Sequence, residues 1–91
     1  MNMYEVNKAI TDYCTQLNDN LIKKNIAYNN SLHNPISIFQ QNNTIEGICC
    51  RIDDKLNRIK CAGITGDTED SIDDLIGYLV HLKISLQNEN K

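Results

Sequence analysis

The sequence predicts an all-α protein of three long helices and one short helical turn. Apolar residues recur at steps of three and four positions along three separate stretches, which is the period of a helix with one buried side. No stretch alternates convincingly between apolar and polar residues, as a half-buried strand does. Because no internal repeat or change of composition divides the chain, residues 1–91 are expected to form a single helical domain.

The first helix is expected over residues 4–27. An Asn-rich stretch follows it, and Pro35 disfavours helix at the residue just before it. One short helical turn is expected at residues 37–41. The apolar stripe of the first helix consists of Val6, Ile10, Tyr13, Cys14, Leu17 and Leu21.

The second helix has a start signal at Asn43, whose side chain can cap the helix while Glu46 completes a capping box. Gly63 and Gly66 bracket the loop that follows this helix. Its apolar stripe consists of Ile45, Ile48, Cys49, Ile52, Leu56 and Ile59.

The third helix is expected to begin at Asp67 or Thr68, either of which can serve as its cap. Glu69 and Asp70 then lie at the positive end of the helix dipole, which favours acidic side chains. The polar tail, residues 86–91, is expected to fray. The apolar stripe of the third helix consists of Ile72, Leu75, Ile76, Leu79, Leu82 and Leu86.

The chain is short for a domain that is stable on its own. It has 91 residues, of which 41% are hydrophobic and only 5% aromatic, with no Trp. A single copy therefore buries a thin core of Leu and Ile. Small chains of this kind often gain stability by association, so we expect a homo-oligomer whose assembly completes the helical bundle.

Charge and hydropathy exclude two classes of partner. The formal net charge of −3 argues against a nucleic-acid polymer, because binding one requires a basic face. No apolar run approaches the roughly 20 residues of a membrane span, so no membrane partner is expected. Residues 1–13 lack the apolar stretch of a signal peptide, which predicts a cytoplasmic protein.

The four cysteines do not form a metal-binding pattern. No Cys-x-x-Cys pair occurs, so the usual spacing of zinc ligands is absent. Cys49 and Cys50 are neighbours, and neighbouring residues of a helix point in different directions. We expect reduced and mostly buried thiols.

Charged side chains are ordered along the second and third helices. One side of the second helix carries, at positions i, i+3, i+4 and i+7, the residues Arg51, Asp54, Lys55 and Arg58. On the third helix Asp70 and Asp74 are one turn apart, and like charges at this spacing cost about 0.2–0.5 kcal/mol per pair. Asp73 and Asp74 lie beyond the reach of the helix dipole, so they need a cationic partner, a metal ion or open water.

Two interpretations of this charge pattern are open. The second and third helices can form an antiparallel hairpin, in which the cations of one pair with the acids of the other and stabilise the fold slightly. Alternatively, the cations form a phosphate site, because Arg forks and a Lys point charge suit phosphate oxygens. Paired carboxylates such as Asp70 and Asp74 suit Mg²⁺, which binds one or two carboxylates together with phosphate and water.

Three segments within residues 21–83 resemble the small phage and bacterial family called nucleotide modification associated domain 1. They are LIKKNIAYNNS, RIDDKLNRIK and EDSIDDLIGYLVHL. In that family a Lys-rich helix end runs into a Tyr-Gly-Asn-Ser turn, and an Arg/Lys helix and an acidic helix follow. The family in turn resembles the all-α nucleotide pyrophosphatases of the MazG type. The resemblance therefore implies a helical protein whose ligands are nucleotides.

The chain departs from these families at the residues that would hold metal. Ala27 stands where the family usually has an acid, and Asn29 stands where it usually has Gly, although Asn can adopt the same left-handed conformation. The pyrophosphatases carry a Glu-Glu-x-x-Glu set on one helix, whereas the second helix here offers only Asp53 and Asp54 among cations. These departures favour binding over hydrolysis, because a magnesium cluster needs several converging oxygens.

The expected function is to bind or sequester a nucleotide or a nucleotide-derived immune signal, without a catalytic residue. By analogy with small oligomeric phage proteins, the signal would be a cyclic oligonucleotide or an ADP-ribose derivative. Mg²⁺ is possible at Asp70 and Asp74 but not required. Tyr28 is expected to stack on a base, Asn30 to read its edge, and the cations to hold phosphate. The expected ligand-binding residues are Lys24, Tyr28, Asn30, Arg51, Asp54, Lys55 and Arg58.

Two other functions stay open at this point. One is a Mg²⁺-dependent nucleotide pyrophosphatase, and the other is a structural or adaptor module whose charged helices pair with another protein. Purely structural roles of two of these residues also stay open. Tyr28 can serve as a helix cap, and Lys24 can complement the helix dipole. His33 is expected in a loop and His81 in solvent or between helices; neither suggests a catalytic triad.

Overall fold

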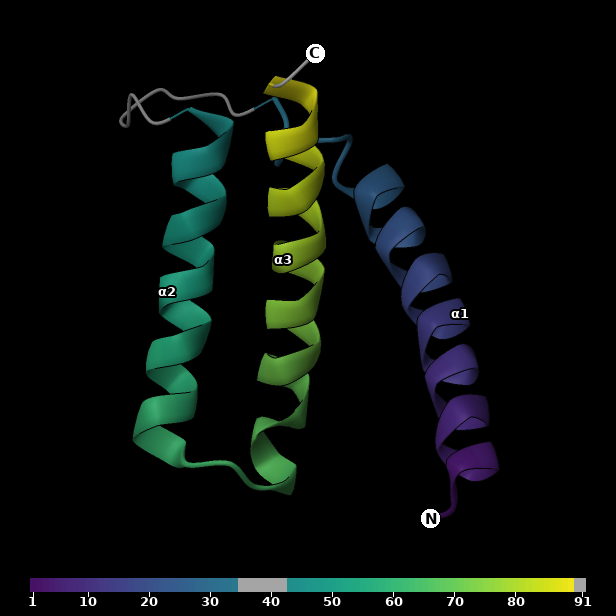
Figure 1. The fold of residues 1–91 in the computed structure, drawn as a ribbon. Coiled ribbons are helices and arrows are strands. Elements are labelled where there is room, and N and C mark those ends of the chain that lie inside the picture. The colour runs from purple at the N-terminus through teal and green to yellow at the C-terminus, as the bar shows by residue number, and fades with distance from the viewer. Residues whose placement is uncertain (35–42, 90–91) are drawn as a thin grey trace. The chain divides into compact units, whose positions relative to one another are not determined.

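The structure is a computed structural model, and it describes residues 1–34 and 43–89. Within these residues the regular structure consists of three α-helices and one 3₁₀ turn, with no strand, which confirms the all-α prediction (Figure 1). The short turn expected at residues 37–41 lies outside the described residues. The chain forms two units, Met1–Asn30 and Ser31–Lys91, which are treated separately below.

The first unit contains α1, which spans Met3–Ala27 and so begins one residue before the predicted start. Its cap is Asn2, whose side-chain oxygen accepts a hydrogen bond from the N–H of Glu5 at 2.8 Å. This helix, described throughout, has no buried residue. The apolar stripe predicted from the sequence is therefore present as a pattern, but none of its members is enclosed.

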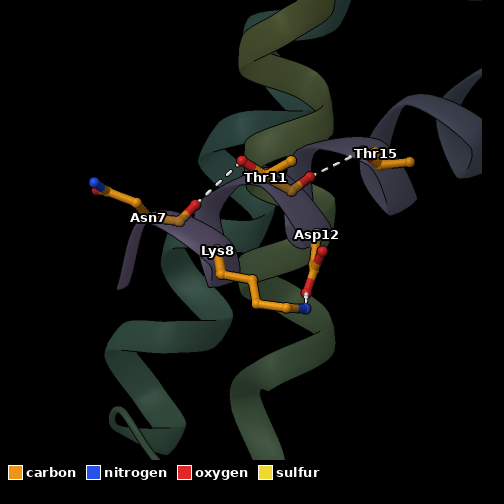
Figure 2. A network of polar contacts seen from close by, with 5 residues as sticks. All are labelled: Asn7, Lys8, Thr11, Asp12 and Thr15. Carbon is orange, nitrogen blue, oxygen red and sulfur yellow. Dashed lines mark hydrogen bonds and ion pairs between the residues drawn. The ribbon is translucent and has the colours of Figure 1, made fainter. Parts of the chain in front are cut away.

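Local polar contacts line one stretch of α1 (Figure 2). Lys8 and Asp12 form an ion pair at 2.9 Å, at the i, i+4 spacing that supports a helix by a few tenths of a kcal/mol. The hydroxyl groups of Thr11 and Thr15 donate to the carbonyls one turn earlier, those of Asn7 and Thr11, at 3.1 and 2.9 Å. These side chains are exposed, so they contribute to helix formation more than to packing.

The second unit contains α2, which spans Thr44–Ala62. The predicted cap is confirmed, because the side chain of Asn43 accepts a hydrogen bond from the N–H of Glu46 at 2.9 Å. The helix ends at Gly63, whose φ of 82° lies in the left-handed region that favours glycine. The N–H of Gly63 donates to the carbonyl of Ile59 at 2.8 Å and closes the last turn.

The helix α3 begins at Glu69, directly after Thr68, which is one of the two predicted cap positions. A 3₁₀ turn that was not predicted, Gly66–Thr68, precedes the helix, and the cap of this turn is Thr65. The hydroxyl of Thr68 accepts from the N–H of Thr65 at 3.0 Å and donates to the carbonyl of Thr65 at 2.9 Å. This reciprocal box takes up the orphan backbone groups two residues earlier than a cap at Asp67 would.

The third helix, α3, spans Glu69–Glu89. It therefore continues into residues 86–89 of the tail that was predicted to fray. Residues 90 and 91 lie outside the described residues. Among the described residues, no helix combines the length and the hydropathy that a membrane crossing requires.

In the second unit α2 and α3 lie side by side and antiparallel (Figure 1). Ile48 of α2 is the one completely enclosed hydrophobic side chain among the described residues, with 0% exposure. On α3 the buried residues are Gly77 and Ser85. Small side chains at these positions leave room for neighbouring groups.

The covered side of α3 includes more than its apolar stripe, of which Ile72, Leu75, Ile76 and Leu82 are half-buried. Four further residues at positions i, i+3, i+7 and i+11 share one side, which we call the polar face of α3: Asp74, Gly77, His81 and Ser85. Each of them is buried or half-buried. In the apolar stripe, by contrast, Leu79 and Leu86 remain 48% and 43% exposed. The expectation that this stripe forms the core was wrong for these two residues.

The four cysteines form no disulfide and are exposed, so the expectation that most of them are buried was wrong. On α2 the reason is helix geometry. Cys49 and Cys50 follow the enclosed Ile48 and are turned about 100° and 200° away from it around the helix axis. The fourth cysteine of the chain, Cys14, belongs to α1, which has no buried residue.

Candidate ligand-binding site

The predicted cations of the second helix lie on α2 and share one side of it. We call Arg51, Lys55 and Arg58 the cationic row; they stand at positions i, i+4 and i+7 of an uninterrupted helix. The three side chains nevertheless have different surroundings, and these differences separate a structural role from a binding role.

Lys55 is the structural member of the cationic row. Its Nζ atom lies 2.9 Å from Oδ2 of Asp74 on α3, and the two side chains are 15% and 32% exposed. This contact is one of the cross-hairpin pairs anticipated from the sequence. Partial burial reduces screening by water, so this ion pair contributes more than a fully exposed one. It also explains how Asp74 tolerates the nearby negative charge of Asp70.

Arg58 forms an ion pair within α2, with 3.3 Å between its Nε atom and Oδ2 of Asp54. Both side chains are more than half exposed, at 60% and 56%, and an exposed pair of this kind stabilises a helix little. A guanidinium group has five N–H donors, so Arg58 can bind an anion while it keeps Asp54 as a neighbour. Asp54, predicted as a ligand-binding residue, thus positions Arg58.

Arg51 is exposed and has no ion-pair partner among residues 1–34 and 43–89. It lies two helical turns before Arg58, which corresponds to about 10 Å along the helix axis. The two guanidinium groups therefore offer planar forks of donors on the same side of α2, at a separation that suits two anionic groups of one ligand.

Asp70 and Asp74, the candidate metal ligands, are one turn apart on α3. The ammonium group of Lys55 occupies the Oδ2 side of Asp74 and repels a divalent cation there. Throughout the part of the chain that the structure describes, no three acid, His or Cys side chains are grouped so as to hold a metal ion. At Asp74 the structure thus shows an ion pair with Lys55 in the place where a metal ion was considered.

The remaining predicted residues lie at the C-terminal end of α1, in the first unit. The N–H groups of Asn29 and Asn30 donate to the carbonyls of Ile26 and Asn25 at 3.1 and 3.0 Å, which is the Schellman pattern of a helix end. Asn29 and Asn30 have φ angles of 53° and 60°. The left-handed conformation expected of Asn29 is confirmed, and Asn30 shares it.

Tyr28 is the C-cap residue of α1, and its side chain is 69% exposed. Its N–H donates to the carbonyl of Lys24 at 2.9 Å, which places the two residues one turn apart at the same helix end. Lys24 lies in the last turn of α1, where a cation complements the helix dipole. An exposed phenol ring at a rigid helix end is available for stacking on a planar ligand.

One cluster in the second unit, formed by His33, His81 and Ser85, was not predicted from the sequence. The Nε2 atom of His33 lies 3.0 Å from Nδ1 of His81, and the Nδ1 atom of His33 lies 3.5 Å from the hydroxyl of Ser85. His33 belongs to the turn that precedes α2, whereas His81 and Ser85 belong to the polar face of α3. Two single histidines so far apart in sequence give no local signal that they meet.

Comparison with known proteins finds no matching family model, no matching curated protein and no matching solved structure.

Proposed function

We propose that the protein binds a nucleotide or a nucleotide-derived signal, such as a cyclic oligonucleotide or an ADP-ribose derivative, and holds it without cutting it. The observation that carries this proposal is the pair of exposed guanidinium groups, Arg51 and Arg58, on one side of α2. Because these groups add little to the stability of the hairpin, an anionic ligand is a physical reason for their arrangement.

Two further features support a nucleotide over a simple anion. In the first unit, taken by itself, the exposed ring of Tyr28 is suited to stacking on a base, since aromatic stacking is tolerant of base identity. The resemblance to the nucleotide modification associated family points to the same class of ligand. A metal-dependent pyrophosphatase has no donor set within the described residues, so sequestration is the preferred mode.

A ligand screen tests the proposed function. The protein is melted in the presence of nucleoside triphosphates, cyclic dinucleotides, ADP-ribose and inorganic phosphate, and a binder raises the melting temperature by mass action. The mixtures are then denatured and separated by chromatography. Recovery of the intact ligand supports sequestration, whereas newly formed nucleoside monophosphate supports the enzyme. A flat response across the panel contradicts the proposal.

A second candidate function is a structural or adaptor module. The ion pair between Lys55 and Asp74 favours it, because this contact gives part of the charge pattern a role in holding α2 to α3. An adaptor would leave the melting temperature unchanged across the ligand panel but would form a complex with a protein partner. The same screen therefore separates the two functions.

We expect ligand binding to be independent of Mg²⁺. The cations of α2 neutralise phosphate directly, and Lys55 occupies the carboxylate that a metal would use. Calorimetric titration in excess EDTA should give a dissociation constant within about twofold of that measured with Mg²⁺ present. Loss of binding in EDTA and its recovery with Mg²⁺ would favour the pyrophosphatase function over the binding function proposed here.

We also propose that the protein is a homo-oligomer. Among the described residues of the second unit, Ile48 is the one hydrophobic side chain that is completely enclosed, while Leu56 on α2 and Leu79 on α3 remain 49% and 48% exposed. Association would cover such side chains and add the hydrophobic stabilisation that a chain of this size lacks. We expect light scattering at micromolar concentration to give a mass of at least two chains. A stable monomer with a high melting temperature would contradict this prediction.

A further inference from the structure

His33 and His81 form a direct contact between the turn at residues 31–34 and the middle of α3. Their facing nitrogen atoms are 3.0 Å apart, and their ring centroids are 5.1 Å apart with a tilt of 52° between the planes. The distance is that of an N–H···N hydrogen bond, and the tilt excludes a stacked pair. The carbonyl of His33 also accepts from the hydroxyl of Thr44 at 3.4 Å, at the start of α2.

The chemistry of two imidazoles limits which protonation states keep this bond. One facing nitrogen must carry a hydrogen and the other must offer its lone pair. The neutral pair meets this condition, and so does the pair with one added proton. When both rings are protonated, every ring nitrogen is a donor and both rings are positive, so the bond is lost and the rings repel each other.

The groups around the pair do not offset that repulsion. From α3, Ser85 offers a neutral hydroxyl to His33, and Tyr78, one turn before His81, carries a phenol hydroxyl. From α2, Thr44 binds the backbone of His33, while Glu46 in the first turn is exposed. No described carboxylate forms an ion pair with either ring.

We propose that His33 and His81 act as a proton-sensitive clasp, which holds residues 31–34 on α3 at neutral pH and releases them when both rings are protonated. The clasp concerns the local structure of the second unit and does not depend on the proposed nucleotide ligand. Its effect is to make the connection that leads toward α2 responsive to mild acid.

The direction of the pH effect follows from His81. Burial lowers the pKa of His81 below its ordinary value of 6.5, and the positive charge of His33 lowers it further. The unfolded chain therefore binds this proton at a higher pH than the folded chain does. Stability is fully present above pH 6.5 and falls as the pH drops below 6.5 toward the lowered pKa of His81.

NMR titration of the wild-type protein between pH 8 and pH 4.5 tests the clasp. We expect the two imidazole signals to titrate in two coupled steps, with the second step below pH 6.5. The amide signals of Leu32, His33 and Asn34 should shift in that second step while the signals of α2 and α3 away from the clasp stay in place. Two independent rings that titrate at their ordinary value, with no change at residues 31–34, would overturn the proposal.

Variants give a second, independent measurement. His81→Gln keeps a neutral hydrogen-bonding group but cannot take up a proton, so the melting temperature should lose its dependence on pH between 7 and 5. His33→Gln removes the second positive charge but leaves His81 half-buried, so it should weaken the dependence without abolishing it. Lys83→Met, at an exposed position of α3 turned about 200° away from His81, is the control that keeps the dependence. An unchanged pH dependence of the melting temperature in both histidine variants would overturn the clasp. In the NMR titration, loss of the signals of all helices together with those of residues 31–34 would also overturn it.

Discussion

Replacing Arg51 or Arg58 by glutamine is expected to weaken ligand binding about ten- to a hundred-fold while leaving the melting temperature unchanged. A charge-assisted hydrogen bond to phosphate contributes about 1.5–3 kcal/mol, which corresponds to this loss of affinity. The two arginines are exposed, and only Arg58 has an ion pair, a weak one within its own helix. Calorimetric titration with the strongest binder of the screen measures the affinity, and thermal melting measures the stability.

Lys60→Gln is the matched control for these two variants. Lys60 is also an exposed cation of α2, but it lies on the opposite side of the helix from the cationic row. Its replacement removes the same charge and should leave binding nearly unchanged. If Arg51→Gln and Arg58→Gln both bind the ligand like the wild type, the cationic row is not a phosphate site and the proposed function fails.

Replacing Lys55 by methionine is expected to have the opposite signature, a loss of stability. The change leaves the half-buried carboxylate of Asp74 without the ammonium group at 2.9 Å. We expect the free energy of unfolding to fall by about 1–3 kcal/mol, between the values for exposed and for fully buried pairs. For a domain of this size the melting temperature should drop by at least about 4 °C.

The double variant Lys55→Met/Asp74→Leu tests whether the loss of stability comes from the carboxylate of Asp74 that Lys55→Met leaves without its ammonium partner. Replacing both partners by apolar side chains should restore most of the stability, because no unpaired charge remains between the helices. Asp54→Asn, which breaks the exposed pair with Arg58, is the control and should change stability by less than about 0.5 kcal/mol. Urea unfolding at a fixed protein concentration measures all three variants. A Lys55→Met protein as stable as the wild type would show that the ion pair is incidental.

The sequence was most informative where a structural feature depends on residues close together in the chain. The cap at Asn43 and the left-handed turn at Asn29 were predicted, since each rests on hydrogen bonds or dihedral angles within a few residues. The 3₁₀ turn before α3 was not predicted, because two local solutions compete. Thr65 and Thr68 form a reciprocal box, whereas Asp67 alone offers a single acceptor.

The sequence was least informative about which side of a helix is covered. The apolar period of α3 predicts a helix correctly, but it does not reveal that the polar face with Gly77, His81 and Ser85 is covered as well as most of the apolar stripe. Burial of the polar face depends on partners from elsewhere in the second unit, namely Lys55 for Asp74 and the turn at His33 for His81. Periodicity records spacing within one segment and contains no information about such partners.

The predicted binding residues divide in the same way. Helical spacing correctly placed the cationic row on one side of α2. It did not reveal that Lys55 forms an ion pair with Asp74, because burial and pairing depend on the neighbouring helix. A structural salt bridge and a ligand site can therefore share one row of charges, and variants of each member are needed to separate them.

The four exposed thiols have a consequence for the chemistry of the isolated protein. The Cβ atoms of Cys49 and Cys50 point apart on a helix, so these neighbours do not bridge without distorting α2. Oxidation will therefore favour links between separate molecules, or adducts with small thiols, over closure within the helix. Preparations that lose reductant will contain covalent multimers. The mass measured for such a preparation will reflect disulfide formation between molecules instead of non-covalent self-assembly.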